Sequence, residues 1–359
     1  EVFAAQFRDR VVHHLYYNYT HELFERTFIA DTYSCIEGRG THFGIERLAQ
    51  HIRQESHNYQ RECYVMKMDK RGYFMHIDRK ILLGIVLRTL RKMANHRIAR
   101  GHRLTWANWI DLDFVAWLSE RIVTLNPKDN CRMVGTVEDW NGLDHSKSLF
   151  YTADGCGLPI GNLTSQLLSN VYLNEFDQYM KRVLHCRHYG RYVDDSFVVS
   201  TDKAWLLSLV PEIRTFLKDR LHLELHMGKL HITSASYGAE FLGGYVKPCR
   251  EYISTQALHR IKQHVDALNM RHPEQAAASI GSMLAVLGHY ASYNIRAQLF
   301  TTGAMLSAFS FNRQLSIVIS PLKEIHLDVF RVVRLPFMII YEQALHMRKA
   351  MLMNSIYFV

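Results

Sequence analysis

The chain has 359 residues, of which 48% are apolar, so it is long enough to fold into two or three packed subdomains around buried cores. Its 43 Lys and Arg residues against 34 Asp and Glu give a net charge of +9, which favours a polyanionic partner without identifying one. The six cysteines form no Cys-x-x-Cys pair, which argues against a zinc ribbon or a disulfide framework and fits a reducing cytoplasm.

No uncharged apolar run reaches the length of about 18 residues that a membrane span needs. The apolar stretch 337–341 is flanked by Arg334 and Glu342, so we expect it to be a core helix. The chain begins at Glu1 without a methionine and lacks a basic-then-apolar leader, so we expect a processed or truncated chain rather than a secreted one.

The first half of the chain alternates helical and strand patterns. Aromatic and basic residues over 7–30 predict a helix that leads into a loop, and a glycine-rich basic stretch follows at 38–44. Apolar residues spaced by three and four over 45–52 predict a second helix. Residues 64–68 are a short apolar run that ends at Asp69, which predicts a strand with an acid at its end.

Helical periodicity resumes over 81–93, whereas residues 95–150 are mixed and carry no evident chemistry. A turn at 155–159 leads into a helical pattern that runs from Leu163 to Phe176 and presents amides and hydroxyls on its other faces.

Two β-rich runs flank a pair of acids in the next segment. Residues 189–193 and 196–199 are separated by Asp194 and Asp195, which predicts a hairpin with both carboxylates at its tip. Further along, we expect a helix, then a strand and turn, and finally helical structure to the end, over residues 206–221, 240–246 and 255–359.

Two adjacent aspartates on a turn, with a third at the end of a distant strand, are suited to binding two divalent cations. Mg²⁺ prefers hard oxygen ligands. Two such ions about 4 Å apart can activate a 3′-hydroxyl and hold a leaving pyrophosphate during in-line attack. The alternative is a solvated turn, because turns favour Asp for backbone reasons. The aromatic and apolar flanks of Asp194 and Asp195 favour the metal site.

The order of these motifs resembles that of reverse transcriptases. Tyr192-Val193-Asp194-Asp195 resembles their Tyr-x-Asp-Asp box, and residues 68–74 resemble their first catalytic box. Residues 157–166 are similar to the box that contacts template and incoming nucleotide, in the form seen in diversity-generating retroelements. Ile160 and Gln166 match that form, which has an apolar residue and Ser-Gln where other relatives have Gln and Ser-Pro.

Further boxes follow the same order. Residues 8–14 and 38–41 resemble two fingers motifs, Gly228-Lys229 resembles the lysine motif near the nucleotide, residues 241–244 resemble the primer grip, and residues 287–296 resemble a thumb helix. The family has a short basic lead-in before this point, so we expect the first fingers element to be incomplete.

The resemblance implies a role for each matching residue. Asp69, Asp194 and Asp195 are the implied catalytic residues and ligands of two Mg²⁺ ions. Phe74 would lie under the sugar and exclude a 2′-hydroxyl by its bulk, and Lys229 would protonate the leaving pyrophosphate. The structural alternatives are a core aromatic for Phe74 and a surface charge for Lys229.

Other implied roles concern the nucleotide and the nucleic acid. Arg39 would reach the triphosphate, although an exposed solubilising arginine is an alternative, and Lys70 and Arg71 are similar candidates. Gly161 would allow close backbone approach to the nascent pair. The residues implied to contact template and primer are Ser165, Gln166, Tyr192, Leu242, Gly243 and Gly244.

Ile160 carries a hypothesis about fidelity. An apolar group in place of a hydrogen-bonding Gln near the incoming sugar removes a polar check on geometry. We therefore expect relaxed fidelity, especially opposite template adenine, as the resemblance implies.

The resemblance predicts an RNA-directed DNA polymerase, a nucleotidyltransferase that extends a DNA or RNA primer on an RNA template with dNTPs. It implies the error-prone enzyme of a diversity-generating retroelement, active in a bacterial or phage-infected cytoplasm with a pentameric accessory variability protein and a retroelement RNA. One alternative is a group II intron or retron-like enzyme, which the Ser-Gln box disfavours. Another is a catalytically silent RNA-binding scaffold, which the three aspartates disfavour because carboxylates repel phosphates.

The implied architecture is the α+β right hand of polymerases, with no RNase H module and no membrane segment. We expect fingers over 1–62, a palm with an antiparallel sheet over 63–254, fingers helices inserted at about 85–150, and a helical thumb with a C-terminal extension over 255–359.

Overall fold

A computed structural model describes residues 2–100, 111–129, 131–141, 143–268, 273–300, 310–311 and 317–318. They form two compact units: the first takes in residues up to 266 and residues 285–292, and the second takes in the described residues of 267–284 and from 293 onward. The core helix expected at 337–341 and the end of the expected thumb lie outside the described residues.

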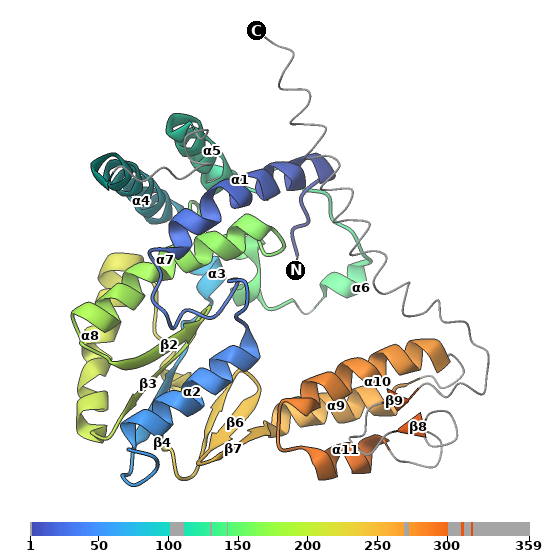
Figure 1. Cartoon of the computed structure of the whole chain (residues 1–359). Coiled ribbons are helices and arrows are strands. Elements are labelled where there is room, and N and C mark those ends of the chain that lie inside the picture. Colours follow the sequence, from blue (N-terminus) through green and yellow to red (C-terminus); the bar gives the residue numbers. More distant parts are fainter. Residues whose placement is uncertain are drawn as a thin grey trace. The chain divides into compact units, whose positions relative to one another are not determined.

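The first unit is built on an antiparallel sheet with the strand order β2-β3-β1-β4 (Figure 1). Its strands are β1 (Tyr64–Met68), β2 (His188–Tyr192), β3 (Asp195–Ser200) and β4 (His231–Ser234). In the register of this sheet Met68 lies opposite Ser196, and Tyr192 lies opposite Asp195. The end of β1 is therefore beside the turn that joins β2 to β3.

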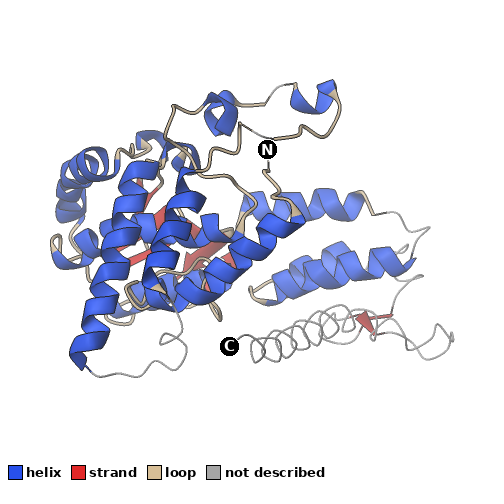
Figure 2. Ribbon diagram, turned by 90° about the horizontal axis from the view of Figure 1, so that it is seen from above, coloured by secondary structure: helices blue, strands red, loops and turns tan. Residues whose placement is uncertain are grey.

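The two faces of the sheet bury alternate residues, as the period of two in a strand requires. On one face Met66, Met68 and Val198 belong to the core that includes α7 (Leu163–Arg182) and α8 (Lys203–Leu221). On the other face Val65, Phe197 and Val199 pack with α2 (Thr41–Glu55). Figure 2 shows helices lying over the strands when the molecule is seen from above.

Further helices extend the first core. The long helix α1 (Phe7–Glu25) packs on α7, and α4 (Arg79–Arg100) packs on both α5 (Leu112–Thr124) and α7. Four short elements lie between these helices in the chain, and η3 lies between α8 and β4: α3 (Tyr73–His76), α6 (Val137–Trp140), η1 (His145–Lys147), η2 (Leu149–Tyr151) and η3 (Met227–Lys229).

A second antiparallel sheet packs on α2. It consists of β5 (Ala239–Phe241), β6 (Gly244–Lys247) and β7 (Arg250–Ile253), and α9 (Thr255–Asp266) follows it. Both residues of the β5–β6 turn have positive φ, +51° at Leu242 and +81° at Gly243. A Cβ added at Gly244 would lie 2.7 Å from Ile45 of α2, so this close approach requires glycine.

In the second unit the structure describes most of α10 (Pro273–Gly288), α11 (Tyr293–Phe300) and a two-stranded ladder. The ladder pairs β8 (Ser310–Phe311) with β9 (Ile317–Val318), where the sequence analysis expects only helix. Ile317 and Val318 are β-branched and suit a strand, which explains the difference. Among the described helices none is long and apolar enough to span a membrane.

Candidate active site

Three aspartates meet at one edge of the central sheet. Asp69 directly follows β1, Asp194 lies in the β2–β3 turn, and Asp195 is the first residue of β3. The carboxyl group of Asp69 forms an ion pair through Oδ2 with the ammonium of Lys229. Its other oxygen, Oδ1, is buried and has no hydrogen-bond partner in the part of the chain that the structure describes.

The turn that carries Asp194 has a strained backbone. Tyr192 pairs with Asp195, so the hairpin loop has two residues, and of these Val193 has a positive φ of +52°. A positive φ at a loop residue favours glycine. A residue with a Cβ pays roughly 1–2 kcal/mol for the left-handed conformation. Something else must therefore hold Val193 in place.

Three polar contacts on the interior side of this turn hold its backbone in place. The amide of Val193 donates to Ser34 Oγ at 3.1 Å, and its carbonyl accepts from Arg191 Nη1 at 2.9 Å. The carbonyl of Asp194 accepts from Lys70 Nζ, also at 2.9 Å. These contacts hold both backbone groups of Val193 and the carbonyl that follows, so the carboxylates project from a fixed base.

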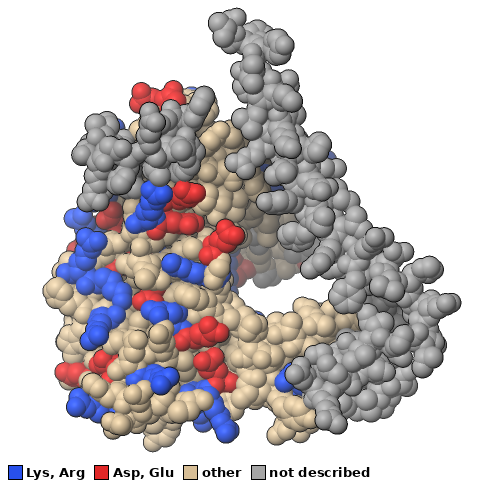
Figure 3. All heavy atoms as spheres, in the orientation of Figure 1, with Lys and Arg blue, Asp and Glu red and all other residues tan. Residues whose placement is uncertain are grey.

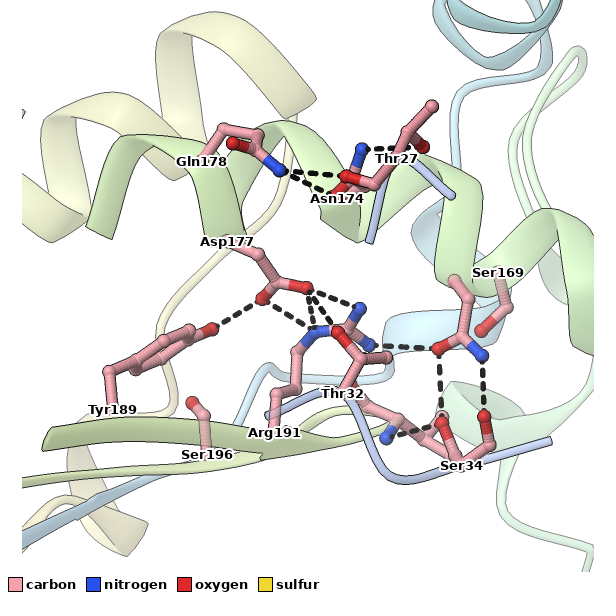
Figure 4. Close-up of polar contacts among 12 residues, drawn as sticks. Thr27, Thr32, Ser34, Ser169, Asn174, Asp177, Gln178, Tyr189, Arg191 and Ser196 are labelled. Carbon is pink, nitrogen blue, oxygen red and sulfur yellow. Dashed lines mark hydrogen bonds and ion pairs between the residues drawn. The ribbon is translucent and has the colours of Figure 1, made fainter. Parts of the chain in front are cut away.

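Arg191 is itself held by a buried ion pair with Asp177 of α7, and both side chains are 0% exposed (Figure 4). The guanidinium donates from Nη2 to Asp177 Oδ2 at 2.7 Å and from Nε to Oδ1 at 2.8 Å. Tyr189 and Thr32 donate their hydroxyls to the same carboxylate. Buried charges are tolerated when they are paired and their remaining sites are satisfied, as they are here.

Burial disfavours the ionised form of two of the carboxylates at the tip. Burial, together with the charges of Asp69 and Asp195, raises the pKa of Asp194 to about 6. Burial is also the main cause that raises the pKa of Asp195. The buried Lys70 ammonium offsets these charges in part, but burial and the nearby Arg191 lower its own pKa to about 8. The ionised carboxylates of Asp194 and Asp195 are thus destabilised by burial, and a bound cation would favour their charged form.

The donor set fits a hard divalent metal. Among the described residues no three His, Cys, Asp or Glu side chains come close enough to enclose a metal ion. Mg²⁺ nevertheless binds through one or two carboxylates and completes its shell with water and substrate phosphates. The unpartnered Oδ1 of Asp69 and the raised pKa of Asp194 are what an open oxygen site of this kind would show.

Besides Lys229, the three other cations expected near the nucleotide occupy different environments. Lys70 is 1% exposed, and its ammonium also donates to Ser196 Oγ at 2.8 Å, beneath the turn. Arg39 donates from Nη1 to the carbonyls of Ala30 and Thr32. By contrast, the side chain of Arg71 is 65% exposed and lies 3.7 Å from Glu224.

The box at 157–166 lies at the start of α7. Phe74 connects it to the β1 end of the site, because the Phe74 carbonyl accepts from the Leu158 amide at 2.9 Å. The ring of Phe74 is half-buried with its centroid 5.3 Å from that of Tyr73. Ile160 is 40% exposed, and its carbonyl accepts from the Phe3 amide. A Cβ at Gly161 would lie 2.9 Å from the Phe3 carbonyl, so the N-terminal segment passes close over this glycine.

The residues expected to contact template and primer lie in three places. Ser165 is buried and Gln166 is exposed in the first turn of α7. Tyr192 is half-buried at the end of β2 and packs with the core that includes α2. The β5–β6 turn consists of Leu242 and Gly243, and Gly244 begins β6 against α2.

Four residues beneath the turn are absent from the sequence-based set. Arg191 and Asp177 carry the buried ion pair, while Ser34 and Asn170 bond to each other across 136 positions of sequence. Periodicity contains a signal for the ion pair. Arg191 shares a strand face with the buried Tyr189, and Asp177 shares a helix face with apolar positions of α7, so each charge lies on a stripe that faces the core.

Comparison with known proteins identifies the family of the chain. The family model described as "Reverse transcriptase (RNA-dependent DNA polymerase)" matches residues 5–246, a segment that includes all three aspartates and Lys229. No curated protein sequence is significantly similar to the chain.

Two solved structures are similar. One is telomerase from Candida albicans in complex with a fragment of telomeric RNA, at 10% identity and a TM-score of 0.40, over 84% of this chain and 48% of that one. The other is apo telomerase from Candida tropicalis, at 11% identity and a TM-score of 0.47, over 83% of this chain and 48% of that one. This chain therefore spans about half the length of each telomerase chain.

Proposed function

Because this chain belongs to the reverse transcriptase family, we propose that it extends a primer on an RNA template by nucleotidyl transfer from dNTPs. The observation that carries this proposal is the meeting of Asp69, Asp194 and Asp195 at one sheet edge, where burial and the neighbouring carboxylates raise the pKa of Asp194. A protein that merely bound RNA would gain nothing from carboxylates placed against phosphates.

In the proposed mechanism the three aspartates would hold two Mg²⁺ ions. Bound there, such ions would favour ionisation of the primer 3′-hydroxyl and neutralise the leaving pyrophosphate. Hydrogen bonding to Asp69 raises the pKa of Lys229, so Lys229 keeps its proton while it is paired. We propose that Lys229 leaves Asp69 when a cation arrives, and then donates its proton to the pyrophosphate.

The contacts of Lys70 and Arg39 support roles different from those expected of them. Both cations already bond to backbone carbonyls, Lys70 beneath the turn and Arg39 in the segment that leads to Ser34. We assign them to positioning the site. The exposed Arg71 remains our candidate for contact with the triphosphate, and Phe74 remains the candidate for excluding a 2′-hydroxyl.

A finer proposal is that the protein is the error-prone polymerase of a bacterial or phage diversity-generating retroelement. The exposed apolar side chain of Ile160, next to Gly161, supports it. The partners proposed with it are a pentameric accessory variability protein and a retroelement RNA. On the face seen in Figure 3, Lys and Arg side chains are interspersed with Asp and Glu, so on this face the contacts with phosphates would be local.

The test is extension of a DNA primer on an RNA template with and without Mg²⁺. We expect extension by the wild type, and a loss of at least a thousandfold in an Asp194→Asn Asp195→Asn variant. A matched control is Asp154→Asn Asp219→Asn, which removes two exposed carboxylates elsewhere. Errors concentrated at template adenines would support the retroelement assignment. If the wild type bound RNA but extended no primer, even with accessory protein and cognate RNA, the polymerase proposal would be wrong. The protein would then be a catalytically silent RNA-binding scaffold.

A further inference from the structure

Helix α1 has an apolar outer side. Its inner side packs on α7 (Figure 1), and Tyr16, Leu23 and Phe24 are buried. Five large apolar residues of the same helix are instead between 37% and 75% exposed: Phe7, Val11, Val12, Leu15 and Tyr19. Each of the other described helices exposes at most two large apolar residues. The concentration of exposed apolar residues on α1 therefore needs a physical reason.

Four of these residues form one continuous row along the helix. Phe7, Val11, Leu15 and Tyr19 are spaced by four positions, and residues four apart are neighbours on a helix surface. Exposed apolar residues that are scattered singly are ordinary, whereas a contiguous apolar patch marks an interface. A row with this spacing packs into the groove beside an equivalent row on another helix. The outer side of α1 is thus suited to contact a second helix.

The charges at the two ends of α1 oppose its own dipole. Arg8 and Arg10 outnumber Asp9 in the first turn, beside the positive end of the dipole. Glu22 lies in the last turn, beside the negative end, and that turn contains no basic residue. The pair that Glu22 forms with Arg26 is long, at 3.8 Å, and about half exposed, so it offsets little. An antiparallel neighbour would bring the basic end of one helix beside the acidic end of the other.

We propose that a second copy of this chain packs antiparallel on α1, with a two-fold axis at Leu15. In this register Leu15 meets the Leu15 of the second copy, Val11 faces its Tyr19, and Arg8 faces its Glu22. A parallel pair would set Arg8 against Arg8 and Glu22 against Glu22, so the charges favour the antiparallel one. The contact uses the same surface on both copies and closes at the dimer. One helix face is small for an interface, so the dimer dissociates at micromolar concentrations.

A second copy accounts for both features of the helix. A nucleic acid could pair with Arg8 and Arg10 but would leave the apolar row without a partner. A different protein could cover the row, whereas an antiparallel copy also supplies the charge that each end of α1 lacks. None of the three site aspartates lies on α1, so this inference goes beyond the proposed function and does not rest on it.

The first test is sedimentation velocity of the 359-residue chain across micromolar concentrations, without nucleotide or nucleic acid. The wild type should pass reversibly from monomer to dimer. Leu15→Glu would place two carboxylates together on the axis and should raise the dissociation constant at least roughly 100-fold. The matched control Leu207→Glu changes a leucine of α8 that is 53% exposed and should leave the constant unchanged.

Three outcomes of this experiment would overturn the proposal. They are a wild type that stays monomeric, a dimer that Leu15→Glu leaves intact, and species that grow beyond the dimer, which would show a head-to-tail contact.

The second test exchanges the charges at the two ends of α1. Arg8→Glu or Glu22→Arg alone sets like charges opposite each other at two symmetric places and should raise the dissociation constant roughly 10-fold. The double variant restores opposite charges and should return the constant to within about threefold of the wild-type value. Each substitution also suits its end of the helix dipole, so weaker association would not arise from loss of α1. Single variants that associate like the wild type, or a double variant as weak as the single ones, would contradict the antiparallel pairing.

Discussion

The side chain of Lys70 runs into the core immediately after a site aspartate. Its ammonium donates to Asp194 O and Ser196 Oγ and lies 4.8 Å from the centre of the Phe176 ring. This direction follows from the strand period, since Lys70 continues the face of Met66 and Met68. Its position in sequence beside Asp69 suggests contact with a phosphate, whereas its place on the strand determines that it supports the turn.

A Lys70→Met variant separates the two roles. Loss of both hydrogen bonds should loosen the turn and lower kcat roughly 10- to 100-fold, because each bond to a charged group is worth about 1.5–3 kcal/mol. The KM for dNTP should stay within about twofold, since the ammonium does not face the nucleotide in this assignment. Steady-state kinetics on an RNA template measure both constants. A variant whose KM rises while kcat is preserved would restore Lys70 to the triphosphate.

At the scale of elements, α2 and β2 are joined by two histidines. His51 Nδ1 and His188 Nδ1 lie 3.0 Å apart, so one donates and the other accepts, and the two nitrogens share one proton. Asp31 lies 3.3 Å from His51 Nε2, and Glu55 lies 3.2 Å from His188 Nε2. Burial, then the charge of His51, lowers the pKa of His188 to about 4.

This pair predicts loss of stability in mild acid. A histidine has a pKa of about 6.5 in the unfolded chain. Because the folded state lowers that value, the unfolded state binds the proton first, so stability is present above about pH 6.5 and is lost as pH falls toward 4. The loss attributable to His188 should reach roughly 3 kcal/mol at most.

Urea unfolding at pH 7.5, 5.5 and 4.5 tests this prediction on the wild type, His188→Gln and the exposed control His259→Gln. The other charged or titratable groups that face His188 are His51, Glu55, Lys181 and Arg187. The pH dependence should be shallower in His188→Gln and unchanged in His259→Gln. Parallel curves for all three proteins would show that His188 does not titrate on unfolding.

For the molecule as a whole, the sequence predicts more of the elements than of their contacts. The expected strand at 64–68, the hairpin around Asp194 and Asp195, and the helix from Leu163 are all present, because each has a clear period and turn signal. The predicted α+β polymerase fold is confirmed by the family match. The boundary between palm and thumb that is expected at 255 stays a prediction. The first compact unit of the structure continues to 266 and also includes residues 285–292.

What sequence patterns could not supply is the pairing of distant polar groups. Ser34 and Asn170 look unremarkable until the fold brings them together. Arg191 and Asp177 each lie on a core-facing stripe, but the stripes do not indicate that the two residues pair with each other. The same holds for Asn162, whose N-cap position is predictable from the start of the helix. That its Oδ1 is buried without a partner among the described residues has no signal in the sequence.

The candidate metal site should also lower the stability of the whole fold. In the folded state the pKa of Asp194 is raised from 3.8 to about 6, so the proton binds more tightly there than in the unfolded chain. The folded state is therefore penalised increasingly as pH rises from about 4 to 6, and the penalty is constant above that range. Asp194→Asn removes the charge and should raise the free energy of unfolding by roughly 1–3 kcal/mol at pH 7.5.

Chemical unfolding with EDTA present measures this difference, with Asp219→Asn as the control for loss of an exposed carboxylate. The gain of Asp194→Asn should shrink as pH is lowered to 4. A variant no more stable than the wild type at pH 7.5 would show that burial and the neighbouring carboxylates do not destabilise the ionised form of Asp194.

The buried contact between Arg191 and Asp177 also makes hairpin formation a discriminating step in folding. A slip of one residue between β2 and β3 would turn Arg191 to the opposite face of the sheet, away from Asp177, and would leave two desolvated charges alone. Misregistered hairpins should therefore be rejected before the first unit consolidates. All chains that complete folding would then hold Asp194 and Asp195 in the same relative position. A heterogeneous preparation should therefore contain fully active enzyme and inactive aggregate, and no folded enzyme with a reduced turnover rate.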